Sequence, residues 1–314
     1  MNLLETQLSY QSGLLKKQQY IDEMYQFHQG LFEYSQFLKE TDITKIEIVD
    51  GGVIFTSKDR GIKIFCDQAD KRTAPFEILN FQVYERVDSD IIFGLIEPGF
   101  NVFDIGANIG WYSLNIAQLH SSTKVWSFEP IPMTFLSLKR NVEINGVQNI
   151  QIHNFGFSNE ETNLKFYLQP EASVSASSAN ITGSNNIIEI ACNVKRLDDF
   201  ITETGLKIDF IKCDVEGGEL FVYQGGIESI KRDKPIIFTE MLRKWSVKFN
   251  YHPNEIINLL AGIGYGCFTA SENHLTEIFL IDENTVETNF FFLHSEKHSE
   301  QIQRFTNQVQ LDCG

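Results

Sequence analysis

Acidic residues follow several apolar segments of the sequence at the points where those segments end. Asp104 ends the segment NVFD and Glu129 follows VWSF, while Asp214, Glu216 and Glu240 follow two later segments, IDFIKC and PIIFT. Ligands of open α/β sheets bind at the carboxyl ends of the strands, so these acids are expected to meet at one site. One such acid alone would more simply cap a helix or lie in a solvated turn. Their recurrence favours a shared site.

The turn after Asp104 has the composition of a ligand-binding loop. Gly106 and Gly110 allow the backbone to approach a ligand closely, and Ala107 and Asn108 lie between them. The three-glycine turn that binds dinucleotide phosphates needs a glycine where Asn108 stands. An acid at the start of the turn favours a ligand with positive charge. S-adenosylmethionine, which carries a sulfonium and an amine, fits this turn better than a diphosphate does.

Glu129 and the adjacent Pro130 extend the expected cofactor site. Glu129 lies 19 residues after Gly110, where an acid can accept hydrogen bonds from both hydroxyls of a ribose. A nicotinamide-dependent oxidoreductase would use the same sheet and the same acid, but it would need the glycine that Asn108 replaces. A scaffold that binds a nucleotide without catalysis is a further alternative.

The acids Asp214, Glu240 and Glu216, in that order, are the candidate general bases. A reaction that removes a proton from its acceptor needs a group within hydrogen-bond reach that takes the proton, and neighbouring acids raise one another's pKa toward neutrality. The same oxygen-rich cluster would also suit a magnesium or calcium ion. Glu216 could instead cap the helix that follows it. Four histidines are weaker candidates, because single histidines more often pack or cap: His153, His252, His294 and His298.

Composition excludes several classes of protein. The 314 residues include 42 acidic and 26 basic side chains, a formal charge of −16, which argues against a nucleic-acid partner. Five scattered cysteines indicate neither a disulfide framework nor a cysteine metal site. No signal peptide and no membrane-spanning segment is expected, so a cytoplasmic location is predicted.

Apolar and amphipathic segments alternate from Asn101 onward, as in a mostly parallel sheet covered by helices. Helices are expected from Met133 to a glycine cap at Gly146, and from Glu219 to Ile230. The small, polar residues 170–186 are expected to form a loop that shapes acceptor specificity. Seven strand segments are expected: NVFDIG, TKVWSFE, IQIHNFG, IDFIKCD, PIIFTEM, YGCFTA and NFFFLH.

Residues 1–83 are expected to form an extension of a helix and β-hairpins, before a catalytic domain at residues 84–314. Residues 1–40 contain an apolar stripe at helical spacing. This stripe suggests a homo-oligomer formed through the N-terminal helix, while the rest of the extension would provide walls for an acceptor.

Three blocks in order resemble the FkbM family of S-adenosylmethionine-dependent methyltransferases. They are VFDIGANIGWYSLNIA, then FEPIPMTFLSLKRNVEINGVQNI, then LDDFI with IDFIKCDVEGGELFVYQGG and PIIFTE, within residues 84–241. The resemblance implies a class I methyltransferase fold, a Rossmann-like α/β fold with seven strands and helices on both faces. It also implies methyl transfer to an oxygen, often a sugar hydroxyl in a glycan or natural product. A methyltransferase for a non-carbohydrate acceptor is the alternative.

Overall fold

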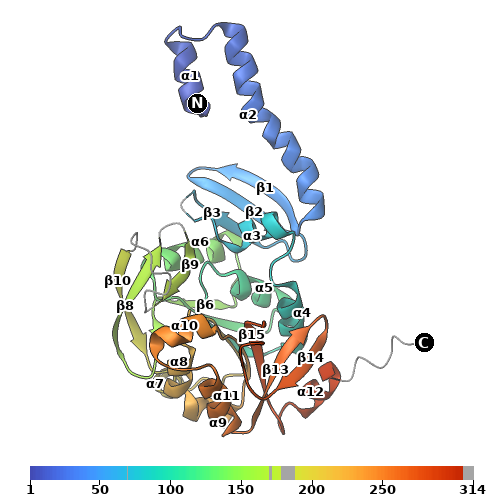
Figure 1. Cartoon of the computed structure of the whole chain (residues 1–314), viewed down its shortest axis with the longest axis vertical. Coiled ribbons are helices and arrows are strands. Elements are labelled where there is room, and N and C mark those ends of the chain that lie inside the picture. The colour runs from blue at the N-terminus through green and yellow to red at the C-terminus, as the bar shows by residue number, and fades with distance from the viewer. Residues whose placement is uncertain (69, 170–171, 178–187, 307–314) are drawn as a thin grey trace, which may run out of the picture.

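The computed structural model describes residues 1–68, 70–169, 172–177 and 188–306. Eight strands form the central sheet in the order β14-β13-β15-β12-β11-β4-β5-β6 (Figure 1). All seven strands expected from the sequence belong to it, and one edge strand, β14, was not predicted. The strands are β4 (Asn101–Ile105), β5 (Lys124–Phe128), β6 (Ile150–His153), β11 (Phe210–Cys213), β12 (Ile236–Glu240), β13 (Tyr265–Ser271), β14 (His274–Ile278) and β15 (Asn289–His294).

The middle of this sheet is parallel and contains a topological switch point. From β4 the chain adds β5 and β6 on one side, and then β11 and β12 on the other, all in parallel pairings. Strands β13 to β15 close the sheet with antiparallel pairings. The reversal between β4 and β11 is where sheets of this kind bind their ligands.

Two layers of helices cover the sheet, because alternate strand residues point to opposite faces. On β4, Val102 belongs to a buried apolar cluster that includes residues of α4, α5 and α12, whereas Phe103 belongs to a second cluster that includes residues of α7, α8, α9 and α11. The strands are therefore apolar on both faces, as expected for a buried parallel sheet. The helices are α4 (Arg86–Leu95), α5 (Trp111–Leu119), α6 (Pro132–Asn145), α7 (Leu197–Thr204), α8 (Glu219–Gly225), α9 (Ile227–Asp233), α10 (Arg243–Ser246), α11 (Asn254–Ala261) and α12 (Ser299–Thr306).

Two expected helices have different outcomes. Helix α6 ends at Gly146, which adopts the left-handed conformation (φ 62°), so the predicted glycine cap is confirmed. The single helix expected from Glu219 to Ile230 is wrong, because the chain forms two helices, α8 and α9, that meet at Gly226. A side chain at Gly226 would contact Leu197 of α7 at 2.6 Å, so close packing against α7 requires glycine there. Two short 3-10 helices are η1 (Leu38–Glu40) and η2 (Val247–Phe249).

A second sheet, in the order β7-β10-β8-β9, stands beside the carboxyl end of the central sheet. Its strands are β7 (Gly156–Phe157), β8 (Thr162–Gln169), β9 (Ala172–Ser177) and β10 (Ile188–Lys195). The expectation of a loop over residues 170–186 is wrong for residues 172–177, which pair with β8 as an edge strand. The rest of that segment lies outside the described residues. Strand pairing, which composition does not reveal, determines the conformation of β9.

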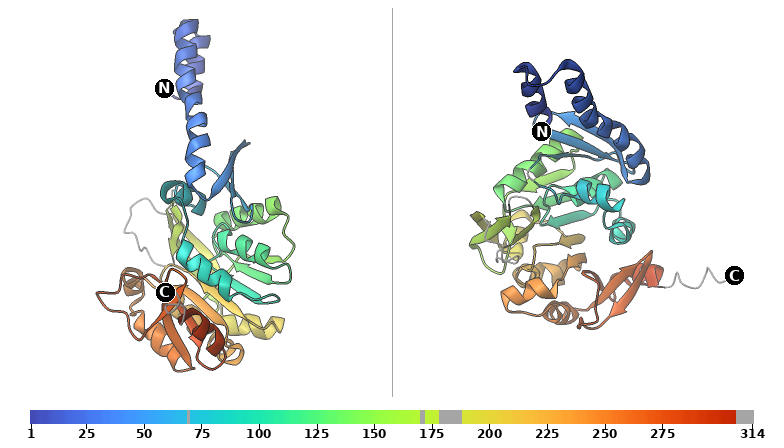
Figure 2. Two further views of the ribbon diagram at one scale, coloured as in Figure 1. Left: turned by 90° about the vertical axis from the view of Figure 1, so that its right-hand side faces the viewer. Right: turned by 45° about the horizontal axis from the view of Figure 1, so that its top comes forward.

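The N-terminal part contains the expected helix and hairpins. Helices α1 (Leu3–Gln11) and α2 (Lys17–Phe37) project from the body, and an antiparallel sheet follows them (Figure 2). Its strands are β1 (Ile43–Val49), β2 (Gly52–Ser57) and β3 (Lys63–Cys66), and α3 (Ala74–Phe81) follows. Strand β3 docks on α6, where the N–H of Phe65 donates to Asn141 Oδ1 at 2.8 Å. No helix in the described part of the chain is both long and apolar enough to cross a membrane.

Candidate active site

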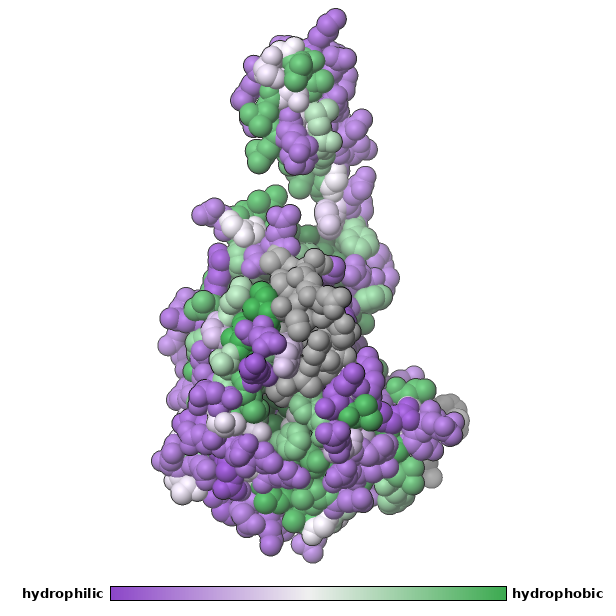
Figure 3. Space-filling model, turned by 60° about the vertical axis from the view of Figure 1, so that its left-hand side comes forward, coloured by the Kyte–Doolittle hydropathy of each residue, from purple (hydrophilic) through white to green (hydrophobic). Residues whose placement is uncertain are grey.

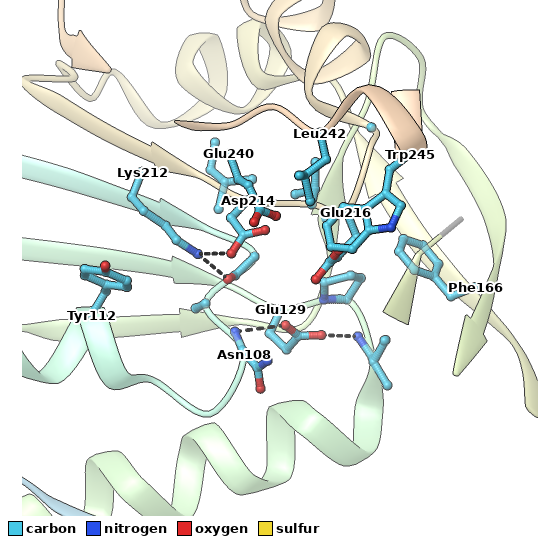
Figure 4. Close-up of a pocket in the computed structure, with 18 of the residues that line it drawn as sticks. Asn108, Tyr112, Glu129, Phe166, Lys212, Asp214, Glu216, Glu240, Leu242 and Trp245 are labelled. Carbon is cyan, nitrogen blue, oxygen red and sulfur yellow. Dashed lines mark hydrogen bonds and ion pairs between the residues drawn. The ribbon is translucent and has the colours of Figure 1, made fainter. Parts of the chain in front are cut away.

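A cavity of about 980 Å³ opens at the carboxyl ends of β4, β5, β11 and β12 (Figure 4). Eight of the residues expected to bind cofactor or substrate line it: the turn Gly106–Asn108, together with Glu129 and Pro130, and the acids Asp214, Glu216 and Glu240 on the opposite side. Its volume is at the upper end of the range typical of small-molecule sites. The cavity therefore has room for two small ligands side by side.

The glycine turn forms one wall, and Gly106 is at its closest point to the neighbouring strand. Gly106 has a φ of 77°, and a Cβ there would overlap the carbonyl oxygen of Asp214. The sequence predicted a close approach of the ligand at this position, whereas the structure shows a close approach of β11. Asn108 also adopts a left-handed φ of 49°, and its buried Oδ1 has no hydrogen-bond partner among the described residues.

Glu129 joins the turn to the end of β5. Its two carboxylate oxygens accept hydrogen bonds from the backbone N–H of Ile131 (2.9 Å) and of Asn108 (3.1 Å). Burial raises the pKa of Glu129 to about 7, against the opposing effect of these two N–H groups. Glu129 is thus held rigidly at the cavity wall with lone pairs available for further donors.

Two residues expected to contact the cofactor, Asp104 and Gly110, are not among the residues that line the cavity. Asp104 is fully buried beneath the turn, where Ser113 donates its hydroxyl to it. Gly110 begins α5 with a φ of 93°, and a Cβ there would lie 2.6 Å from Leu138 of α6. Asp104 and Gly110 therefore contact the protein interior on the side of the turn that faces away from the cavity.

Lys212 connects the turn to the acids, and the sequence interpretation missed it. Its ammonium group is buried between Asp104 (3.6 Å) and Asp214 (3.4 Å), and it donates a hydrogen bond to the carbonyl of Gly106 (2.8 Å). Burial opposes the charge on Lys212, but Asp214 and Asp104 outweigh it and hold the lysine's pKa above its ordinary value. A lysine inside the apolar segment IDFIKC was the available signal, because lysine is almost never fully buried unless it is paired.

The three acids form one cluster. Carboxylate oxygens of Asp214, Glu216 and Glu240 all lie within 4.8 Å of one another. Burial raises the pKa of Glu216 and of Glu240 well above the ordinary value, and the charge of Asp214 raises both further. The predicted mutual effect of the acids on their pKa is therefore present, and Figure 4 shows them facing the turn.

The sequence offered a helix cap as an alternative role for Glu216, but helix α8 has no side-chain cap at its N-cap residue, Gly218, and a different acid binds the turn before it. The N–H groups of Val215 and Gly217 donate to Glu219 Oε1 at 3.1 and 3.0 Å. Glu216 itself adopts a left-handed φ of 55°, an uncommon conformation that occurs often at functional sites. The turn directs the Glu216 carboxylate to the cavity, as Figure 4 shows.

Aromatic side chains form the outer wall of the cavity, and the sequence interpretation did not assign them to the site. Trp245 comes from α10 and Phe166 from β8 of the second sheet, and both face the acids in Figure 4. Trp111 and Tyr84 also line the cavity. Trp111 directly follows the glycine turn, whereas Tyr84, Phe166 and Trp245 are distant in sequence and show no local motif, so only the tertiary structure reveals these three.

The four histidines lie outside the cavity. His153 stacks on Phe128 with ring centroids 5.0 Å apart, and His252 accepts a turn hydrogen bond from the Asn254 N–H. His294 and His298 are buried, and the N–H of His294 donates to His298 Nδ1 at 2.9 Å. Their low weight as site residues is consistent with these contacts.

The fold and the site define an α/β enzyme of the Rossmann-like class, with a ligand cavity at its switch point. The family model described as the methyltransferase FkbM domain matches residues 104–267, about half of the chain. The chain belongs to the FkbM methyltransferase family, and the predicted resemblance is confirmed. The matched segment carries the whole turn and acid cluster.

Curated relatives are similar to this chain over part of their length. Methyltransferase 1 of Beauveria bassiana is 30% identical over 142 residues, which are 40% of this chain and 57% of that protein. The 2-O-methyltransferase NoeI of Sinorhizobium fredii is 26% identical over 49% of this chain and 68% of its own length. The 31-O-demethyl-FK506 methyltransferase FkbM of Streptomyces tacrolimicus is 29% identical over 41% of this chain and 60% of its own.

Among solved structures, the methyltransferase FkbM from Methylobacillus flagellatus superposes with a TM-score of 0.41 and 20% identity. The superposition covers 69% of this chain and 53% of that one.

Proposed function

We propose that the protein is an S-adenosylmethionine-dependent O-methyltransferase that transfers a methyl group to a hydroxyl of a sugar in a glycan or natural product. The observation that carries this proposal is that one cavity combines the glycine turn and Glu129 with a cluster of three carboxylates. Membership of a methyltransferase family supports the transferred group. The names of two relatives, which are O-methyltransferases, support oxygen as the atom that receives it.

The cavity wall suits the cofactor. The Glu129 carboxylate would accept hydrogen bonds from the ribose hydroxyls. Asn108 Oδ1, which has no hydrogen-bond partner among the described residues, offers a further acceptor beside it. The aromatic ring of Trp111 also lines the cavity and offers an apolar surface. The acids opposite favour a cationic ligand over a diphosphate.

The chemistry needs alignment and a base. S-adenosylmethionine, when bound, supplies an electrophilic methyl group on a positively charged sulfur. The acceptor oxygen forms a bond to that methyl carbon while the carbon–sulfur bond breaks and its electron pair stays on sulfur. The hydroxyl proton goes to a carboxylate of the cluster, Asp214 first, then Glu240, then Glu216 in order of expectation. The aromatic wall would exclude water and hold the acceptor in line.

A sugar acceptor suits the outer half of the cavity. Carboxylates accept hydrogen bonds from hydroxyls, and the flat faces of Trp245 and Phe166 can pack against the apolar face of a sugar ring. The same surfaces would accept a non-carbohydrate hydroxyl compound, which remains the alternative acceptor. Buried free thiols at Cys66, Cys192, Cys213 and Cys267 support the proposed cytoplasmic location.

The base is tested with Asp214→Asn, which keeps the size of the side chain and removes its ability to take a proton. With a panel of sugar acceptors, the methyl-transfer rate should fall by about 10² to 10⁴, the usual contribution of a positioned base. The affinity for S-adenosylhomocysteine should stay near that of the wild type. Glu240→Gln and Glu216→Gln are parallel variants, because coupled acids share their titration.

A metal is the other possible use of the acid cluster, and a chelator separates the two. Inhibition of the wild type by a chelator, with partial rescue of Asp214→Asn by excess Mg²⁺, would assign the cluster to a cation. Full activity of all three variants without chelator sensitivity would remove the acids from the mechanism and leave alignment as the main catalytic effect.

A further inference from the structure

The first 37 residues form an arm that stands away from the body of the molecule (Figures 1 and 2). Helix α2 has 21 residues and no buried side chain, and α1 buries only Thr6. A helix in a globular protein normally gains its stability by burying an apolar face. The arm therefore lacks the packing that would normally stabilise helices of this length.

The arm is nevertheless rich in apolar side chains. Thirteen of the 24 large hydrophobic residues exposed in the described part of the chain belong to it. Leu31 is 58% exposed and Phe32 is 66% exposed. Figure 3 shows apolar residues across one side of the arm. Exposed apolar surface on this scale marks an interaction site.

The spacing of these residues fits a helix that packs against another helix along its length. Tyr20, Met24, Phe27, Leu31, Tyr34 and Leu38 follow one another at alternating intervals of four and three residues. This is the heptad pattern of helices in coiled coils. Helix α1 covers only the beginning of the row, where Tyr10 stacks on Tyr20 with centroids 4.4 Å apart. The later residues of the row, from Phe27 to Tyr34, remain exposed.

The exposed area is sufficient for a stable dimer. Thirteen large side chains, exposed by about half and with roughly 150–250 Å² each, offer about 1,000 Å² or more per arm. Specific interfaces bury about 800 Å² per partner. An arm that pairs with an identical arm would meet this requirement without any contribution from the body.

Charge favours a second copy over a membrane or nucleic acid. Residues 1–40 contain three lysines and five acids, so the arm lacks the basic face that binds anionic surfaces.

We propose that the arm is a dimerisation element, which packs along the exposed row of α2 against the arm of a second copy of this chain. The inference does not depend on the methyl-transfer reaction, because the arm contributes no residue to the cavity.

Analytical ultracentrifugation of the full-length protein at micromolar concentration tests this proposal. The wild type should sediment as a species of twice the 36.0-kDa chain mass, and Leu31→Glu as a single chain. Leu136→Glu is the matched control, because Leu136 is 63% exposed on helix α6 of the body, and this variant should remain dimeric. A monomeric wild type, or a Leu31→Glu variant as dimeric as the wild type, would overturn the proposal. Leu31-dependent flotation of the wild type with anionic phospholipid vesicles would also overturn it, in favour of a membrane surface.

Discussion

At the scale of single residues, the site depends on how carboxylates are held. Glu129 is fixed by two backbone N–H groups, whereas Asp214 is held by the buried Lys212. The sequence predicted both acids, because each follows an apolar strand segment. It did not predict Lys212, because the contact of a lysine with two acids from separate strands requires the strand order.

Cofactor affinity should depend on the protonation of Glu129. Its pKa of about 7 means that the carboxyl ionises near neutral pH, and only the ionised form accepts hydrogen bonds with both oxygens. Binding of a ribose to that form lowers its pKa, so affinity should rise with pH up to about 7 and level off above it. Calorimetric titration with S-adenosylhomocysteine across this range measures the effect.

Glu129→Gln provides the control for this titration. It should bind about 1.5–3 kcal/mol more weakly, the usual value of hydrogen bonds to a charged group, and its affinity should show no such rise with pH. Equal affinities of the variant and the wild type would remove Glu129 from the ribose site.

Lys212→Met should lower the free energy of unfolding by about 3–5 kcal/mol, because it leaves the fully buried carboxylate of Asp104 without its cation. Urea denaturation measures this loss. The matched control is Lys207→Met, which breaks a pair with Asp209 (2.6 Å) at a lysine that is 60% exposed, and which should cost no more than about 1 kcal/mol. Adding Asp104→Asn to Lys212→Met should recover part of the stability. A loss no larger than that of the control would show that Lys212 does not hold the site together.

At the scale of the elements, the strand-to-turn-to-helix unit around Gly106 was predictable from the sequence. The reason why glycine is required at two positions of this turn was not. The segment VFDIGANIG shows a strand, a glycine turn and a helix start. That Gly106 faces the backbone of Asp214, and that Gly110 faces α6, depends on which elements are neighbours. The same limit applies to β9. Its polar sequence is typical of a loop, and it is a strand because it pairs with β8.

Two glycine substitutions separate close packing from local conformation. Gly106 and Gly146 both have positive φ, but a Cβ at Gly146 meets nothing within 4 Å, whereas at Gly106 it overlaps Asp214. Gly146→Ala should cost about 1–2 kcal/mol of stability and leave affinity for S-adenosylhomocysteine unchanged. Gly106→Ala should cost more stability and also weaken binding at least tenfold. Equal binding losses in the two variants would contradict the role of the Gly106 turn.

At the scale of the whole molecule, the fold was predictable because its signals are periodic and repeated. Seven apolar strand segments separated by helices specify a mostly parallel sheet, and the acids at their ends indicate the functional edge. The aromatic wall was not predictable, since Phe166 belongs to strand β8 of the second sheet and Trp245 to helix α10. The charge of −16 is consistent with a site that favours a cationic cofactor.

The central claim is that the cavity binds the adenosine of S-adenosylmethionine beside a cluster of acids. Isothermal titration of the wild-type protein with S-adenosylhomocysteine and, separately, with NAD tests it most directly. The account predicts micromolar binding of S-adenosylhomocysteine, about −8 kcal/mol, and no measurable binding of NAD. Tighter binding of NAD, or no binding of S-adenosylhomocysteine, would contradict it.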